Sequence, residues 1–220
     1  AHEIKNPLTP IQLSAERLRK KYADEIHSDR DTFLKCTDTI LRQVADIGRM
    51  VDEFSSFARM PAAEMTDMDL RDALKDPVTL FQMSSNSTYE IVLRQPDQPI
   101  RMMADQRLLS QALTNLIKNA TESVQALAES PEKPDGFKGR VEATLRRERE
   151  TAVIEVVDNG LGLPKQNRAR LLEPYVTTKG NKGTGLGLAI VQKIVESHGG
   201  TLTLEDAPLA PGRTRGALVR

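Results

Sequence analysis

Apolar residues recur at alternating intervals of four and three along residues 1–58, the pattern of two helices that each carry a heptad seam. A polar stretch from Ala23 to Arg30 separates the two runs and is suited to a turn. Two helices of this length cannot bury both seams alone, so we expect a hairpin that dimerises into a four-helix bundle. A hairpin that packs its seam on the rest of the chain is the alternative. The seam residues are Ile4, Leu8, Ile11, Ala15, Leu18 and Tyr22, then Phe33, Thr37, Ile40, Val44, Ile47, Val51, Phe54 and Ala58.

The helical pattern ends after residue 58. Residues 59–66 contain Pro61 and show no period, so we interpret them as a linker to a second domain over 67–220. That domain mixes the two periodicities, which predicts an α/β fold. Helices are expected over 70–83, 105–127 and 186–198, and strands over 89–94, 100–104, 140–148, 151–158, 201–205 and 216–220.

Charge and composition bear on three questions: a nucleic-acid partner, disulfides and membrane segments. The chain has 31 basic and 31 acidic side chains, so no nucleic-acid partner is expected. The single Cys36 cannot form an intramolecular disulfide and fits a reducing compartment. No apolar run approaches the roughly 20 residues that span a bilayer. Because the chain begins inside an expected helix, we expect a fragment, with any membrane segment outside it.

Two asparagines on the helix expected over 105–127 are candidate metal ligands. Asn115 and Asn119 are spaced by four residues and therefore share a face, away from the apolar stripe. Amide oxygens are neutral, hard ligands suited to Mg²⁺, an ion commonly shared with substrate phosphates. Taken alone, such a pair is most often part of a solvated helix face.

Two glycine-rich segments are candidate binding loops. In the first, DNGLGLP (158–164), Asp158 ends a strand where it can accept a hydrogen bond from an exocyclic amine. Gly160 and Gly162 let the backbone approach a ligand closely. The second, GTGLGLAIV (183–191), opens a helix whose N–H groups and dipole favour an anion. Its spacing is neither that of a P-loop nor that of a dinucleotide-binding turn. Each segment alone could be a simple turn.

Residues 173–183, EPYVTTKGNKG, lie between the two glycine-rich segments and are polar and irregular. A segment of this kind beside a phosphate site is a natural lid, in which Lys179 and Lys182 would meet phosphate charge. The alternative is an ordinary surface loop.

The order and spacing of these segments resemble the ATP-binding domain shared by histidine kinases, type II topoisomerases, Hsp90-type chaperones and MutL-type repair proteins. NLIKNA (115–120) resembles the N box, DNGLG (158–162) the G1 box, EPYVTTK (173–179) the F box and GTGLGL (183–188) the G2 box. The F box departs from its common form at Tyr175 and Val176, where two Phe often stand. The resemblance implies an α/β sandwich that binds ATP and Mg²⁺, with the metal held by Asn119 and Asn115. It assigns nucleotide binding to Asn115, Asn119, Asp158, Gly160, Gly162, Lys179, Gly183, Thr184, Gly185, Leu186 and Gly187.

The first ten residues, AHEIKNPLTP, resemble the H box of sensor histidine kinases, and the residues that follow resemble the NtrY-type kinases of nitrogen regulation. The resemblance implies a homodimeric cytoplasmic region of a membrane-anchored bacterial sensor. Its His2 would be phosphorylated by ATP and would pass the phosphoryl group to an Asp of a response regulator receiver domain, similar to NtrX. Glu3 would accept the proton or orient the ring, and Asn6 would hold water for a phosphatase reaction. Pro7 is expected to loosen the helix beside His2.

Two other functions fit part of this pattern. An ATPase of the same fold that acts as a conformational clamp would use the same boxes, but it needs no phosphorylatable His on a heptad hairpin. A dimeric scaffold that binds nucleotide only for structure is the third reading. The intact Asn119, Asp158 and glycines of the second segment argue against the scaffold.

Overall fold

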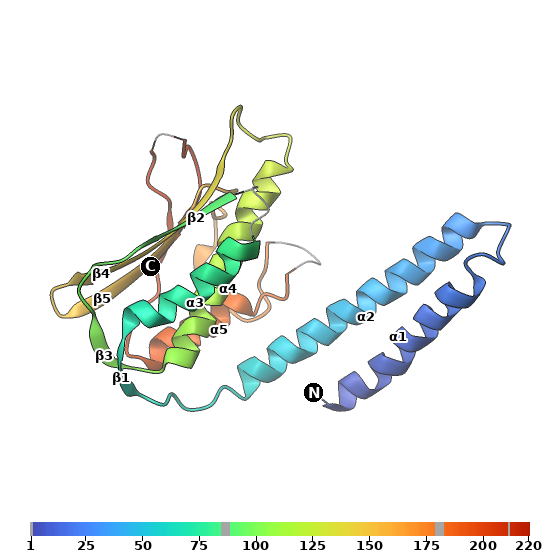
Figure 1. Cartoon of the computed structure of the whole chain (residues 1–220), viewed down its shortest axis with the longest axis horizontal. Coiled ribbons are helices and arrows are strands. Elements are labelled where there is room, and N and C mark those ends of the chain that lie inside the picture. Colours follow the sequence, from blue (N-terminus) through green and yellow to red (C-terminus); the bar gives the residue numbers. More distant parts are fainter. Residues whose placement is uncertain (1, 85–88, 179–182, 211) are drawn as a thin grey trace. The chain divides into compact units, whose positions relative to one another are not determined.

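The computed structural model describes residues 2–84, 89–178, 183–210 and 212–220, with His2, Glu3 and Ser56 described by their backbone alone. The chain divides into two compact units between Pro61 and Ala62. The first unit is a hairpin of α1 (His2–Tyr22) and α2 (Arg30–Ala58), shown in blue in Figure 1. The Arg30 guanidinium closes the turn by donating to the Ala23 carbonyl oxygen at 2.6 Å. The helices and turn therefore lie where the apolar pattern predicts them.

Only part of the heptad seam is buried within the hairpin. On α2 every second seam position packs against α1, and the positions between them remain on the surface. Ile40, Ile47 and Phe54 are 42%, 40% and 48% exposed. On α1, Ala15 is buried while Ile11 and Leu18 are exposed. A single hairpin thus leaves an apolar stripe uncovered. The buried α2 positions are Thr37, Val44 and Val51.

The second unit packs helices on one face of a sheet (Figure 1). The five-stranded sheet has the order β2-β4-β5-β7-β6, with β2 parallel to β4 and the other pairs antiparallel. A separate two-stranded ladder pairs β1 with β3 antiparallel. The strands are β1 (Thr66–Asp69), β2 (Tyr89–Arg94), β3 (Arg101–Ala104), β4 (Gly139–Glu148), β5 (Thr151–Asp158), β6 (Leu204–Asp206) and β7 (Ala217–Val219). The helices are α3 (Leu70–Ser84), α4 (Gln106–Ala128), the 3-10 helix η1 (Arg168–Leu172) and α5 (Gly187–Ser197).

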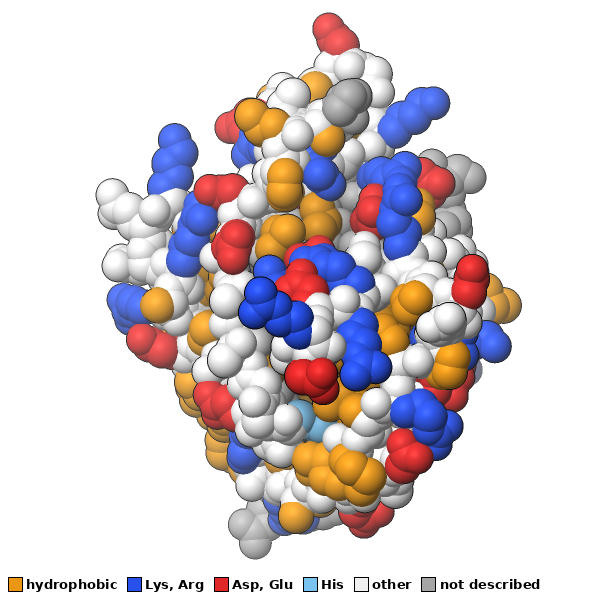
Figure 2. All heavy atoms as spheres, turned by 90° about the vertical axis from the view of Figure 1, so that its left-hand side faces the viewer, with side chains coloured by type: hydrophobic (Ala, Val, Ile, Leu, Met, Phe, Trp, Pro, Cys, Tyr) orange, Lys and Arg blue, Asp and Glu red, His pale blue; other side chains and the backbone are white. Residues whose placement is uncertain are grey.

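Strand β4 shows how the sequence alternation separates the core from the surface. Val141, Ala143 and Leu145 point inward and are fully buried, whereas the residues between them point outward and are charged or polar. On the outer side Arg146 pairs with Glu155 of β5. Figure 2 shows that basic and acidic side chains are interspersed on one side of the molecule, as the zero net charge suggests. No helix within the described residues is long and apolar enough to cross a bilayer.

Three differences from the predicted elements have local causes. Strand β1 begins at Thr66, inside the range predicted as linker. It was not predicted because its sequence, TDMD, has a single buried residue, Met68, and is too short to show a period. The short helix η1 follows Asn167, whose left-handed backbone (φ 56°) no residue pattern indicated. Strand β6 begins at Leu204, although Thr203 still exchanges backbone hydrogen bonds with Arg220.

Asp69 joins β1 to α3 and makes the stability of the second unit depend on pH. The Arg71 guanidinium lowers the pKa of Asp69 below its usual value, because its Nε donates to Oδ2 at 2.8 Å. The N–H groups of Arg71 and Ile100 add to this effect against opposing burial. A carboxylate with a lowered folded-state pKa stabilises the fold above its unfolded value and loses that contribution as pH falls through the folded one. We therefore expect Asp69→Asn to destabilise the protein at pH 7, by an amount that shrinks as the pH falls below the usual pKa of an aspartate. Urea unfolding of both proteins over a series of decreasing pH values measures this, and a penalty that does not change with pH would contradict it.

Candidate functional site

One face of α4 carries the polar residues of the candidate site. Asp105 caps the helix by accepting the Leu108 N–H at 3.0 Å. Leu113, Ile117 and Val124 belong to the apolar stripe of α4 and are buried in the core. Away from this stripe lies a row of half-buried polar side chains spaced by four residues. The row consists of Asn115, Asn119 and Ser123.

The first glycine-rich segment is tied to the end of this row. Asp158, at the end of β5, is 5% exposed, and its Oδ1 accepts the Gly160 N–H at 2.8 Å. The Ser123 hydroxyl accepts the Leu161 N–H at 3.0 Å and lies 3.5 Å from Asp158 Oδ1. A Cβ at Gly160 would lie 2.5 Å from the Ser123 carbonyl carbon, so only glycine allows this approach to α4. The carboxylate is thereby held in place from two sides.

The second glycine-rich segment reaches the middle of the same row. Helix α5 begins at Gly187, and a Cβ there would lie 3.7 Å from Asn119 Nδ2. Gly185 has a left-handed backbone (φ 69°), and its carbonyl oxygen accepts the Tyr175 N–H at 3.0 Å. Leu186 is buried and anchors the segment, while its N–H points to the Thr184 hydroxyl at 3.4 Å. The segment thus presents the start of a helix to the Asn119 side chain.

Two further contacts shape the first glycine-rich segment and were not predicted. Gly216 has φ 146°, and a Cβ there would lie 1.9 Å from the Asp158 carbonyl oxygen. A lone glycine inside a predicted strand is a signal of such close approach.

Asn159 is buried; its Oδ1 accepts the Arg140 N–H at 2.7 Å and its Nδ2 donates to the Lys138 carbonyl at 2.8 Å. Ser123 could have been found because it continues the spacing of the two asparagines.

Other predicted site residues are placed less fully. Asn6 lies exposed on α1, four residues after His2, which begins that helix. The side chains of His2 and Glu3 and the whole of Lys179 and Lys182 lie outside the described residues. Gly162, with φ 79°, packs against the backbone of Gly216, where a Cβ would lie 3.3 Å from the carbonyl oxygen.

The donor set on α4 suits a cation that arrives with a nucleotide. Among the described residues, no group of three or more His, Cys, Asp or Glu is arranged to hold a metal by itself. Asn115 and Asn119 instead offer two half-buried amides with neutral oxygen atoms, and the Asn119 side chain lies beside the start of α5. Mg²⁺ is commonly bound in this way, through one or two protein oxygens, phosphates and water. The residues present therefore fit such an ion.

Removing the Ser123 hydroxyl tests whether ATP binding depends on the contacts that hold Asp158 in place. Ser123→Ala removes the acceptor of the exposed Leu161 N–H, and the net loss of one such hydrogen bond, about 1 kcal/mol, should weaken the binding of ATP by roughly fivefold. Calorimetric titration with ATP measures the loss. Ser110→Ala is the matched control, because its hydroxyl also lies on α4 but bonds the Ala73 carbonyl away from the site. Equal affinities for both variants would contradict a positioning role.

Family models match both units. Residues 1–63 match the His Kinase A (phospho-acceptor) domain, and residues 104–220 match the histidine kinase-, DNA gyrase B- and HSP90-like ATPase domain. The nitrogen regulation protein NtrY of Azorhizobium caulinodans is 52% identical over all of this chain, which covers 27% of that protein. A putative NtrY-like sensor histidine kinase of Rickettsia felis is 38% identical over 94% of the chain, which covers 32% of its length. The chain thus spans about a third or less of these relatives.

Solved structures share the fold. Full-length ShkA, solved in complex with AMPPNP, matches 99% of this chain with a TM-score of 0.67 and 23% identity, over 43% of its own length. ThkA, solved in complex with the response regulator TrrA, matches the whole chain with a TM-score of 0.66 and 24% identity, over 57% of that chain. At these identities the likeness speaks for the fold alone.

Proposed function

The chain belongs to the histidine kinases, and on that basis we propose that it is the catalytic core of a two-component sensor kinase. It binds ATP in the second unit, phosphorylates His2 in the helical hairpin, and passes the phosphoryl group to an aspartate of a response regulator. One observation carries the proposal: a single face of α4 touches both glycine-rich segments, at Ser123 and at Asn119. These two contacts support a nucleotide site along α4, with Asp158 as the reader of the base and the start of α5 as the phosphate site.

The two ends of this face suit the two ends of ATP. Asp158 is nearly buried, and the N–H groups that hold its Oδ1 keep it oriented to accept from the adenine amine. At the other end, the first turn of α5 presents N–H groups that have no partner within the helix, and the positive end of a helix dipole, to the phosphates. Mg²⁺ held by Asn119 and Asn115 would neutralise phosphate charge. Phosphoryl transfer requires such positioning and charge neutralisation more than covalent chemistry.

The hairpin supplies the acceptor. His2 and Glu3 stand at the start of α1, where a neutral imidazole can attack the terminal phosphorus and the neighbouring carboxylate can take its proton. Asn6 lies one turn further on and is exposed. Its amide is placed on the same side of the helix as His2, where it can orient a water molecule against a phosphorylated aspartate. The same helix therefore serves kinase and phosphatase reactions.

The uncovered seam of the hairpin favours a homodimer. Ile11 and Leu18 of α1 and Ile40, Ile47 and Phe54 of α2 are all more than a third exposed. A regularly spaced apolar stripe of this kind is closed most simply by a second copy of the hairpin, which gives a four-helix bundle. The partner for phosphotransfer is a receiver domain, and the likeness to NtrY favours one similar to NtrX.

The fate of the γ-phosphate separates this function from its rivals. We expect the chain, incubated with γ-labelled ATP and Mg²⁺, to retain label on the protein and to transfer it to a purified receiver domain. A clamp ATPase of the same fold would release the label as inorganic phosphate without a labelled protein. A nucleotide-binding scaffold would leave the ATP intact. Either of these results would overturn the proposal.

A further inference from the structure

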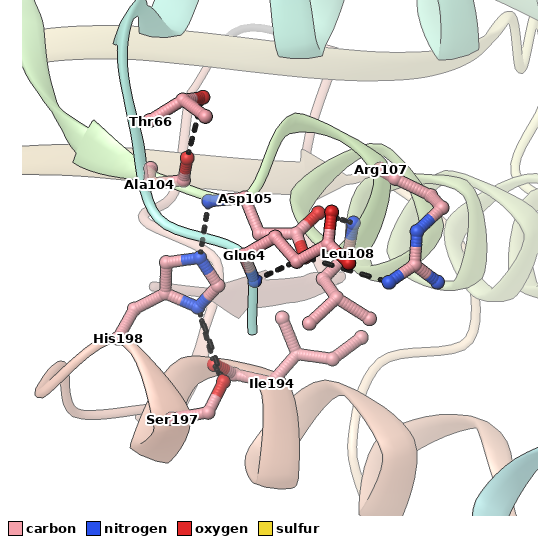
Figure 3. Close-up of polar contacts among 9 residues, drawn as sticks. All are labelled: Glu64, Thr66, Ala104, Asp105, Arg107, Leu108, Ile194, Ser197 and His198. Carbon is pink, nitrogen blue, oxygen red and sulfur yellow. Dashed lines mark hydrogen bonds and ion pairs between the residues drawn. The ribbon is translucent and has the colours of Figure 1, made fainter. Parts of the chain in front are cut away.

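A polar cluster ties the linker to the two helices of the nucleotide site, and Figure 3 shows its members pointing toward one another. Asp105, which is 4% exposed, lies at its centre between β3 and α4. Its Oδ1 accepts the Leu108 N–H at 3.0 Å, and its Oδ2 accepts the Glu64 N–H at 3.0 Å. Burial alone would raise the pKa of Asp105, but these N–H groups and the Arg107 guanidinium lower it below its usual value. Asp105 therefore binds the linker as a carboxylate.

His198, directly after α5, holds Asp105 from the other side. The Asp105 N–H lies 3.0 Å from His198 Nε2, and His198 Nδ1 lies 2.8 Å from the Ile194 carbonyl oxygen (Figure 3). An amide N–H can only donate and a carbonyl can only accept, so Nε2 carries the lone pair and Nδ1 the hydrogen. The ring is thus a neutral bridge from the end of α5 to the start of α4. We call Glu64, Asp105 and His198 the linker anchor.

The linker anchor connects places that the reaction must coordinate. Helix α5 begins beside Asn119 and is followed directly by His198, while Asp105 directly precedes α4, which carries Asn119. The backbone of Arg59 is still bonded to α2 through Ser55. Within the described residues, Glu64 is the first residue after α2 whose backbone bonds to the second unit. Residues 60–63 therefore lie between these two bonded positions, a shorter stretch than the linker expected from the sequence.

From this arrangement we infer that His198 is a positioning residue for phosphorylation of His2. His198 supports Asp105, and Asp105 in turn attaches the linker at Glu64 to the nucleotide-binding unit. The inference rests on the proposed kinase function. A short tether gives a high effective concentration of one unit near the other, and a longer or looser tether lowers it. Without the His198 acceptor, the Asp105 N–H loses its partner and Glu64 its fixed support. The unit then spends less time in the reactive arrangement while its nucleotide site is intact.

Two substitutions in the whole chain test this role. His198→Leu removes the acceptor at similar size, whereas His198→Gln places an amide oxygen where Nε2 accepts. We expect His198→Leu to lower kcat for autophosphorylation about tenfold, as misplacement remote from the reacting atoms can do, with KM for ATP changed less than about twofold. His198→Gln should recover most of the rate. His27→Leu, the same change in the exposed turn of the hairpin, is the matched control and should leave kcat unaltered.

Amide hydrogen exchange makes the test independent of kinase activity. In His198→Leu we expect faster exchange at the N–H groups of Glu64 and Asp105, with unchanged protection in β4 as the internal reference. Faster exchange throughout would mean general unfolding and would overturn the inference. So would a wild-type kcat in His198→Leu, a rise in KM that accounts for the loss, or a Gln variant as impaired as the Leu variant. If the wild-type chain fails to phosphorylate itself, the proposed function fails, and the exchange result still decides whether His198 holds the linker.

Discussion

Replacing Asn119 with alanine should lower autophosphorylation by on the order of a hundredfold, the scale typical of removing one preorganised group from a reacting centre. The Asn119 side chain lies against Gly187, at the start of the helix proposed to receive the phosphates. Without its amide oxygen, the cation that neutralises these phosphates loses a protein ligand. The fold should be retained, because Asn119 is half-buried on the polar face of α4 and outside the apolar core. The rate of label incorporation at saturating ATP and Mg²⁺ measures the effect.

Gln125→Ala is the matched control for Asn119→Ala. It also removes an amide from α4, but from an exposed position outside the row of Asn115, Asn119 and Ser123. Its rate should equal that of the wild type. If Asn119→Ala kept more than a tenth of the wild-type rate, the proposed role of α4 in holding the cation would be wrong.

Gly185→Ala should cause the second large loss, because it combines two costs. At φ 69° a residue with a Cβ is strained by about 1–2 kcal/mol. In addition, the Cβ would lie 2.5 Å from the Tyr175 carbonyl carbon and 2.7 Å from the Val176 nitrogen, and both are backbone atoms. The second glycine-rich segment must then move away from residues 173–178, and the start of α5 with it. We expect ATP affinity to fall more than tenfold, measured by calorimetric titration.

Gly136→Ala isolates the steric part of this effect. Gly136 has nearly the same backbone, φ 68°, but nothing within 4 Å of its ideal Cβ. It should lose about 1–2 kcal/mol of stability and keep wild-type ATP affinity, because only the left-handed strain applies. If the two alanine variants bound ATP equally well, contact between Gly185 and Tyr175 would have no part in forming the site.

The elements that could be predicted from the sequence are those with a long period or a strong turn signal. The hairpin over 1–58 and the helix carrying Asn119 repeat their apolar residues over many turns, so burial leaves little choice of face. Strand β1 was missed because its four residues bury only Met68. The apolar period predicted that one hairpin cannot bury both seams, but it did not identify the positions that stay exposed, since these depend on how one helix rotates against the other.

The parts of the candidate site that could be predicted are those where the spacing of glycines indicates that two backbone segments lie too close together for a side chain. Gly160 and Gly185 were singled out from their spacing, and a side chain at either position would overlap backbone atoms. The supporting residues were not predicted because their function lies in contacts between segments distant in sequence. Ser123 meets Leu161, and His198 meets Asp105 across 93 residues of chain. A single histidine after a helix forms no sequence pattern that could indicate such a partner.

The site of phosphorylation tests the central claim most directly. After incubation with γ-labelled ATP and Mg²⁺, the wild-type chain should carry label that is lost in acid and stable in alkali, as a phosphoramidate is. The label should be absent from His2→Gln and present at the wild-type level in His27→Gln, which alters an exposed histidine of the hairpin turn. Label that persists in His2→Gln, or label with the acid stability of a phosphoserine in the wild-type chain, would contradict phosphoryl transfer to His2.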